Sequence, residues 1–216
     1  MKKIIIVIIS ICITATAFAQ PPSIGIGAVV SPSWQKFSID NFENEPIDID
    51  VTFSVRPIGV QAYLDVGSLI FTATYARSKT LKIEASGSDA GFSAGNVVEG
   101  NLEITTISFG GLLKLPISLG NITLFPLLGA EYMLTLDIEG ADSSFMDNYN
   151  RIWLKGGLGL DIPLNQQIYL RPTALFGFGL PNKYDDFVKA GGFDIEFPDS
   201  PFVGRFDFGV ALGFWF

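Results

Sequence analysis

Histidine is absent from the 216-residue sequence, and the single cysteine, Cys12, lies among the first twenty residues. Without an imidazole, no Ser-His or Cys-His pair can activate a nucleophile, which excludes hydrolases of that kind. The lack of histidine and cysteine also removes the usual ligands of zinc. We therefore expect a protein that is not an enzyme and that has neither a metal site nor a cofactor.

Long apolar runs are also missing. After residue 20, no stretch approaches the roughly twenty apolar residues that a membrane-spanning helix requires. Yet charged residues make up only 17% of the chain and hydrophobic residues 48%, including 19 phenylalanines, which is too apolar for a typical secreted soluble protein. If the chain lies in a membrane, a closed β-barrel is the remaining architecture, because every backbone polar group in lipid must be paired.

The first nineteen residues have the pattern of a secretory signal peptide. Lys2 and Lys3 form a basic start, residues 4–13 are apolar, and residues 17–19 form an A-x-A cleavage site. We expect a signal peptide at residues 1–19 and one domain at residues 20–216. Removing the two lysines leaves 12 basic against 22 acidic residues, a net charge of −10, which disfavours binding to nucleic acid.

The end of the chain has the clearest periodicity. Every second residue from Phe206 onward is large and apolar, and a period of two is the geometry of a β-strand. The six residues of this face are Phe206, Phe208, Val210, Leu212, Phe214 and Phe216.

Seven more segments have this period, which gives eight predicted strands. The eight predicted strands cover residues 23–30, 51–65, 69–77, 101–115, 121–138, 152–162, 167–180 and 203–216. Long connections at 31–50, 78–100, 139–150 and 181–201 alternate with short turns. An even strand number with alternating loop lengths is typical of bacterial outer-membrane barrels. We predict an all-β fold, an eight-stranded antiparallel up-and-down transmembrane β-barrel.

The apolar parity shifts at two places, residues 56–57 and residues 105–106. We interpret the first shift as a bulge at Pro57, since proline cannot serve a regular ladder. The alternative to a membrane protein is a soluble periplasmic binder of the lipocalin type, apolar inside and solvated outside. The second face of the strands, mostly Gly, Thr and Ala, is a poor water-facing surface and favours the membrane barrel.

Charged residues on this second face are the candidate functional residues. The predicted inward-facing set is Arg56, Lys114, Glu131, Lys155, Asp161, Arg171 and Asp207. Glu131 and Lys155 fall on neighbouring strands at similar height, so an ion pair between them is feasible. Because isolated buried charge is costly, we predict a network of paired charges that fills the lumen. The alternative is a gate or polar pathway for small solutes.

The signal peptide, eight strands, alternating loops and aromatic C-terminus resemble small outer-membrane β-barrel proteins of the OmpA/OmpX/OmpW type. Residues 113–116 (LKLP), 126–132 (PLLGAEY) and 170–172 (LRP) are similar to such domains from Gram-negative and spirochaete-like bacteria.

The resemblance implies an outer-membrane location, contact with outer-membrane lipid, and recognition of the C-terminal strand by the barrel assembly machinery. It implies either a structural or surface-interaction role or, as in OmpW-like proteins, a narrow channel for small or hydrophobic solutes. A monomer, with an extracellular ligand at the loops, is the expected state.

Overall fold

The computed structural model describes residues 21–42, 45–87, 96–138, 150–180 and 202–216. The predicted signal peptide and the predicted loop at 181–201 lie outside the described residues, as does all but the last residue of the predicted loop at 139–150. Among the described residues, no helix is long and apolar enough to cross a membrane.

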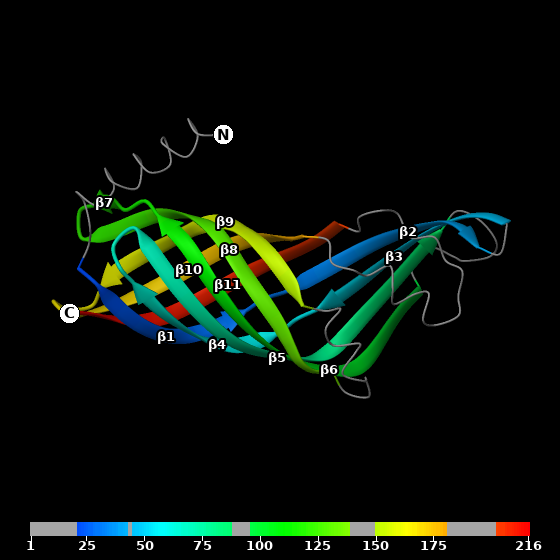
Figure 1. The fold of residues 1–216 in the computed structure, drawn as a ribbon, viewed down its shortest axis with the longest axis horizontal. Helices are drawn as coiled ribbons and strands as arrows, with labels where there is room; N and C mark the ends of the chain where they lie inside the picture. Colours follow the sequence, from blue (N-terminus) through cyan, green and yellow to red (C-terminus); the bar gives the residue numbers. More distant parts are fainter. Residues whose placement is uncertain (1–20, 43–44, 88–95, 139–149, 181–201) are drawn as a thin grey trace.

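Eight strands close into an antiparallel barrel (Figure 1). Around the ring, each strand pairs with the next, and the last pairs with the first. The prediction of an all-β, eight-stranded antiparallel barrel is confirmed. In ring order the strands are β1 (Ser23–Val30), β4 (Ile58–Asp65), β5 (Leu69–Gly87), β6 (Asn96–Lys114), β8 (Ile122–Ile138), β9 (Arg151–Pro163), β10 (Ile168–Gly179) and β11 (Phe202–Trp215).

The predicted loop at residues 31–50 is instead mostly a hairpin. Its strands, β2 (Ser33–Phe42) and β3 (Glu45–Val55), pair with each other, while β2 also pairs with β11 and β3 with β5. The hairpin continues the wall beyond the barrel, beside the long ends of β5 and β6 (Figure 1). The acidic sequence of this segment has no alternation of apolar and polar residues, so the period of two did not predict these strands.

Two prolines mark the level at which the barrel continues into this extension. Pro32 separates β1 from β2, and Pro57 separates β3 from β4, so the predicted single strand at 51–65 is two strands. The Ser31 N–H donates to the Pro57 carbonyl at 2.9 Å across the break. Proline has no N–H for a ladder, so both strands are interrupted at this level.

Tight turns lie at the opposite end, together with the start of β1 and the C-terminus (Figure 1). Between β4 and β5, Gly67 has a φ of 86°, and its N–H donates to Asp65 Oδ1 at 3.1 Å. The predicted turn at 116–120 contains a further short strand, β7 (Ile117–Leu119), which pairs with β8.

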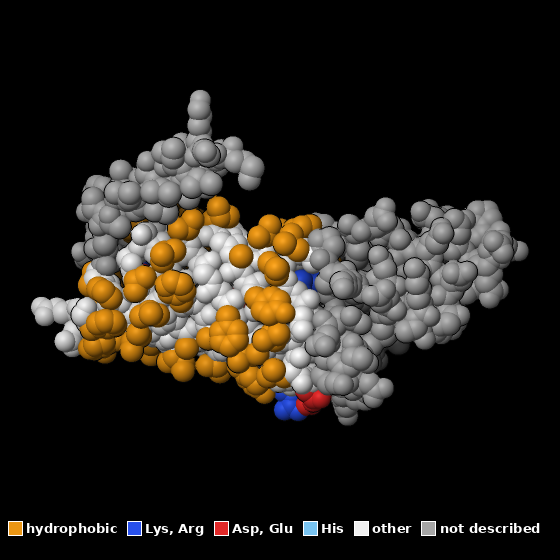
Figure 2. Space-filling model, viewed as in Figure 1, with side chains coloured by type: hydrophobic (Ala, Val, Ile, Leu, Met, Phe, Trp, Pro, Cys, Tyr) orange, Lys and Arg blue, Asp and Glu red, His pale blue; other side chains and the backbone are white. Residues whose placement is uncertain are grey.

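Large apolar side chains cover the outside of the barrel (Figure 2). On β11, the outward residues from Phe206 to Phe214 are 42–54% exposed, although all are apolar. The acidic and basic side chains visible in Figure 2 lie at the edge of this apolar surface. An exposed band of this kind is what lipid, and not water, accommodates.

The inside of the barrel holds buried charged and polar side chains together with an apolar cluster. A buried cluster contains Tyr63, Phe125 and Tyr169, with Trp215 packed against it. Hydrogen bonds link three hydroxyl groups in and beside this cluster. The Tyr63 hydroxyl donates to that of Tyr169 at 2.8 Å, and the hydroxyl oxygens of Ser23 and Tyr169 are 2.6 Å apart. The narrow lumen is therefore filled by side chains.

Candidate functional site

Two clusters of opposite charges occupy the lumen, one above the other. The turn-side cluster consists of Asp65 on β4, Lys114 on β6, Asp161 on β9 and Arg171 on β10. The hairpin-side cluster consists of Glu131 on β8, Lys155 on β9, and Arg205 and Asp207 on β11. All eight side chains are buried, and each cluster contains two acids and two bases.

In the turn-side cluster, two cations bridge two carboxylates. Lys114 Nζ lies 2.6 Å from Asp65 Oδ2 and 3.4 Å from Asp161 Oδ2. Arg171 Nε donates to Asp161 Oδ1 at 2.6 Å, and Arg171 Nη2 donates to Asp65 Oδ2 at 2.5 Å. Since these residues come from strands on different sides of the ring, the cluster ties the barrel walls together across the lumen.

Aromatic rings enclose these cations. The Arg171 guanidinium carbon lies 4.5 Å from the Tyr63 ring centroid, 5.0 Å from that of Tyr169 and 5.1 Å from that of Phe125. Lys114 Nζ lies 4.7 Å from the Phe125 centroid. Cation–π attraction in a water-poor site adds to the ion pairs. Lys114 has no exposed surface, and Asp161 is 1% exposed, so solvent is excluded at this level.

The hairpin-side cluster has the same alternation of charge. Lys155 Nζ contacts Glu131 Oε2 and lies 2.7 Å from Asp207 Oδ2. Arg205 Nη2 donates to Glu131 Oε1 and, at 3.0 Å, to Asp207 Oδ2. The Arg205 guanidinium also lies 4.7 Å from the Trp153 ring centroid.

Six of the seven predicted inward charges lie in these clusters, and the predicted pairing of Glu131 with Lys155 is present. Arg56 does not lie in the lumen: it is exposed, just beyond the end of β3. Odd-numbered residues face inward on both sides of the break, since Phe53, Val55 and Pro57 line a cavity and Tyr63 is buried. The inward parity predicted for Arg56 is therefore wrong.

The sequence interpretation missed two members of the clusters. Asp65 ends the predicted strand at 51–65 and shares the parity of the inward Tyr63, but the predicted inward-facing set does not contain it. Arg205 shares the parity of Asp207, so extending the alternation by two residues would have found it. In both cases the period of two is the signal, and both residues lie near an end of a predicted strand.

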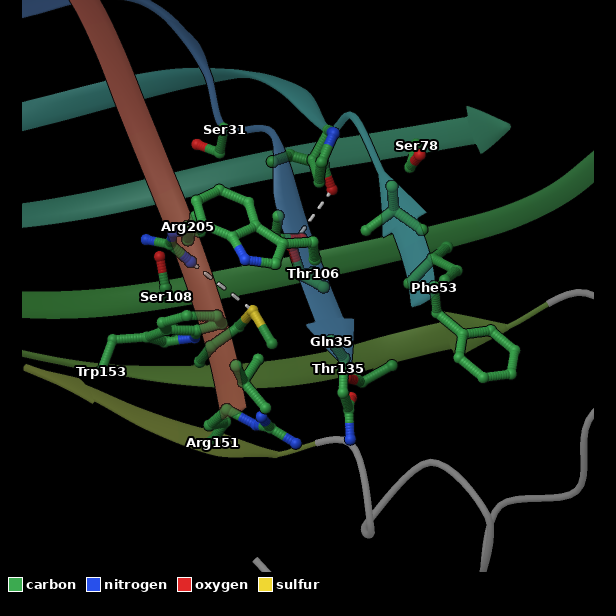
Figure 3. Close-up of a pocket in the computed structure, with 18 of the residues that line it drawn as sticks. Ser31, Gln35, Phe53, Ser78, Thr106, Ser108, Thr135, Arg151, Trp153 and Arg205 are labelled. Carbon is green, nitrogen blue, oxygen red and sulfur yellow. Dashed lines mark hydrogen bonds between the residues drawn. The ribbon is translucent and has the colours of Figure 1, made fainter. Parts of the chain in front are cut away.

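A cavity of about 190 Å³ lies above the hairpin-side cluster, between the barrel and the β2–β3 hairpin (Figure 3). Arg205 and Trp153 contribute to its lining from the barrel, while Gln35 and Phe53 do so from the hairpin. The parity shifts of the sequence are explained here. Phe53, Val55 and Ile104 turn their apolar side chains into the cavity, not toward lipid.

The six residues of the predicted assembly signal lie on the outer face of β11 or at its end. Their exposed fractions run from 42% for Phe214 to 65% for Phe216. They are thus available to lipid or to a partner, and none contributes to the lumen.

No model of a protein family matches the chain, and no curated protein matches its sequence significantly. Among solved structures, the outer membrane protein OprG from Pseudomonas aeruginosa is similar, with 13% identity and a TM-score of 0.51. The alignment covers 92% of this chain and 97% of OprG.

Two further structures align less closely. Neisserial surface protein A has 11% identity and a TM-score of 0.44, over 92% of this chain and 99% of that protein. The outer membrane protease OmpT from Escherichia coli has 5% identity and a TM-score of 0.43, over 92% of this chain and 97% of OmpT. At such identities the likeness shows the fold alone, which is that of a small outer-membrane β-barrel. The expectation that the chain is not an enzyme still rests on its missing histidine.

Proposed function

We propose that this chain is an integral outer-membrane β-barrel protein with a structural or surface-interaction role and a lumen closed to solutes. One observation carries the proposal: two stacked, buried clusters of ion pairs fill the barrel. Eight charged side chains from six of the eight strands are used for this purpose. A buried charge that lacks its partner is strongly destabilising, so each cluster is expected to act as a unit.

The membrane location is supported by the apolar outer face and by the position of the charges beyond it. Toward the hairpin end of this face, Arg77 forms an ion pair with Glu103, near the level of the proline breaks. We place the tight turns and termini in the periplasm and the β2–β3 hairpin outside the cell. Export by the signal peptide at 1–19 is part of the proposal, and so is a monomeric state, because the closed ring leaves no free barrel edge.

The outer face of β11 would have two uses. It would contact lipid in the finished barrel, and before insertion it would present the terminal aromatic pattern to the barrel assembly machinery. The exposure of all six residues in the finished fold supports this, because none is held in place by a partner inside the barrel.

Conductance and stability measurements test the closed lumen. The wild-type protein in planar lipid bilayers should show no steady conductance, and Glu131→Ala should lower the temperature of heat-induced unfolding. Glu99→Ala, at an exposed residue of β6, is the matched control and should leave that temperature unchanged. If Glu131→Ala also leaves the unfolding temperature unchanged, the hairpin-side cluster has no role in stabilising the barrel.

A steady wild-type conductance would instead favour the narrow channel for small or hydrophobic solutes. Cell fractionation and heat-modifiable gel migration test the membrane location itself. A soluble, heat-insensitive protein would contradict it and favour a periplasmic binder of the lipocalin type.

A further inference from the structure

We infer that the cavity above the hairpin-side cluster is a binding site for a small amphipathic organic anion, such as a monocarboxylate with an apolar body. This goes beyond the closed, structural barrel proposed above and does not depend on whether the lumen conducts. The cavity is bounded by the barrel on one side and by the hairpin on the other (Figure 3).

Unsatisfied hydrogen-bond donors point to the ligand. Trp153 is 3% exposed, and its Nε1 has no hydrogen-bond partner among the described residues. The same holds for Gln35 Nε2 and Thr135 Oγ1, both on residues that line the cavity. A buried polar group that lacks a partner carries the full cost of its desolvation. A ligand that offers acceptor oxygens would satisfy these groups.

The charged side chains of the lining favour an anion over a neutral ligand with acceptor oxygens. The described lining includes two guanidinium groups, Arg151 and Arg205, and no carboxylate. Arg205 already contacts Glu131 and Asp207 in the hairpin-side cluster, which forms the floor of the cavity, and Arg151 is the second guanidinium of the lining. Arg205 Nη1 has a sulfur contact, to Met133 Sδ at 3.8 Å, and a thioether is a weak acceptor that an oxygen could replace.

Most of the other lining surface is apolar, which favours a ligand with an apolar part attached to its charged group. Figure 3 shows Arg151, Trp153 and Arg205 on one side of the view and Phe53 on the other. Leu81, Leu102 and Ile104 add aliphatic surface from β5 and β6. At about 190 Å³ the cavity is smaller than the roughly 300–1,000 Å³ of pockets for drug-sized molecules, so it suits a smaller ligand.

Three probes with one apolar body and different head groups test the inference. The full-length mature protein in lipid nanodiscs is titrated calorimetrically with 4-phenylbutyrate, 4-phenylbutanol and 4-phenylbutylamine, with the heats from empty nanodiscs subtracted. We expect one phenylbutyrate per barrel, bound at least about tenfold more tightly than the alcohol or the amine. Equal binding of the amine, or no saturable binding of the acid, would overturn the inference.

Variants then locate the site. Trp153→Phe keeps the ring but removes the indole N–H, and it should weaken phenylbutyrate binding about tenfold. The control is Trp215→Phe, the same change where the ring stacks on Tyr169 at the turn end, 4.4 Å between centroids, and it should leave affinity unchanged. Gln35→Leu, on the hairpin, provides a second test should Trp153→Phe impair folding, which heat-modifiable migration would reveal. Wild-type affinity in a folded Trp153→Phe or Gln35→Leu variant would contradict the site.

Discussion

Arg171 on β10 and Asp161 on the neighbouring β9 form a two-point contact inside the barrel: Arg171 Nε donates to Asp161 Oδ1 at 2.6 Å, and Nη2 donates to Asp161 Oδ2 at 2.9 Å. Two parallel N–H···O bonds fix the geometry as well as the charge balance. The same guanidinium extends to Asp65 on β4, so one arginine links three strands.

Asp161→Asn should destabilise the barrel strongly. The change leaves two cations, Lys114 and Arg171, facing one carboxylate in a site without solvent, and breaking a buried ion pair in this way costs about 3–5 kcal/mol. Urea unfolding in detergent micelles measures the effect. Asp137→Asn, at an exposed residue of β8, is the control and should stay within about 0.5 kcal/mol of wild type. Equal stability of the two variants would show that the turn-side cluster contributes nothing.

Two glycines on adjacent strands should respond oppositely to alanine. A Cβ at Gly129 would lie 2.0 Å from the Gly111 carbonyl oxygen, which is backbone and cannot move aside, whereas a Cβ at Gly111 meets nothing within 4 Å. Gly129→Ala should therefore cost about 1–3 kcal/mol through overpacking. Gly111→Ala should leave stability unchanged or slightly raised. Urea unfolding in detergent micelles is the measurement, and equal stability of the two variants would contradict the packing.

A charge on the lipid face should be costly at mid-height and tolerated near the rim. Leu158 on β9 is 52% exposed in the apolar band, and Leu158→Arg should destabilise the barrel in lipid vesicles by about 2–4 kcal/mol. Leu136→Arg, beside the exposed Asp137, should cost only about 0–1 kcal/mol. In a soluble barrel both positions would face water, so equal, small effects would argue against the membrane.

Deleting Phe216 should lower the yield of assembled barrel severalfold while the precursor is still exported and processed. The physical reason is the loss of the terminal aromatic, which directly follows β11 and is 65% exposed. Membrane fractionation with heat-modifiable gel migration measures assembly. Phe216→Tyr keeps an aromatic ring and serves as the control; an unchanged yield after deletion would rule out a role in assembly.

Strand periodicity alone identified most of the barrel. Successive side chains of a strand leave on opposite sides for local steric reasons, so the outward face of β11 and the inward positions of Glu131, Lys155 and Asp207 could be predicted without tertiary information. The even strand count and the alternating loop lengths then predicted closure, which the ring of pairings confirms.

The β2–β3 hairpin could not be predicted in this way. Binary patterning depends on having one apolar side and one polar side, and the acidic residues 40–50 lack that contrast. Pairing with β5 and β11 supplies the order instead, through backbone hydrogen bonds to strands distant in sequence.

The sequence by itself determined which residues alternate, and therefore a closed barrel with charges inside. Only the tertiary structure decided which charges meet and what the parity shifts mean. Ion-pair partners depend on the stagger of strands around the ring, which brings Asp65 to Lys114 and Arg171 from non-adjacent strands. The alternation of side chains continues across the proline breaks, but the surroundings of each face change there. Apolar side chains such as Phe53, which the pattern would place toward lipid, line the cavity instead. Local sterics set the faces; the nonlocal arrangement sets what each face contacts.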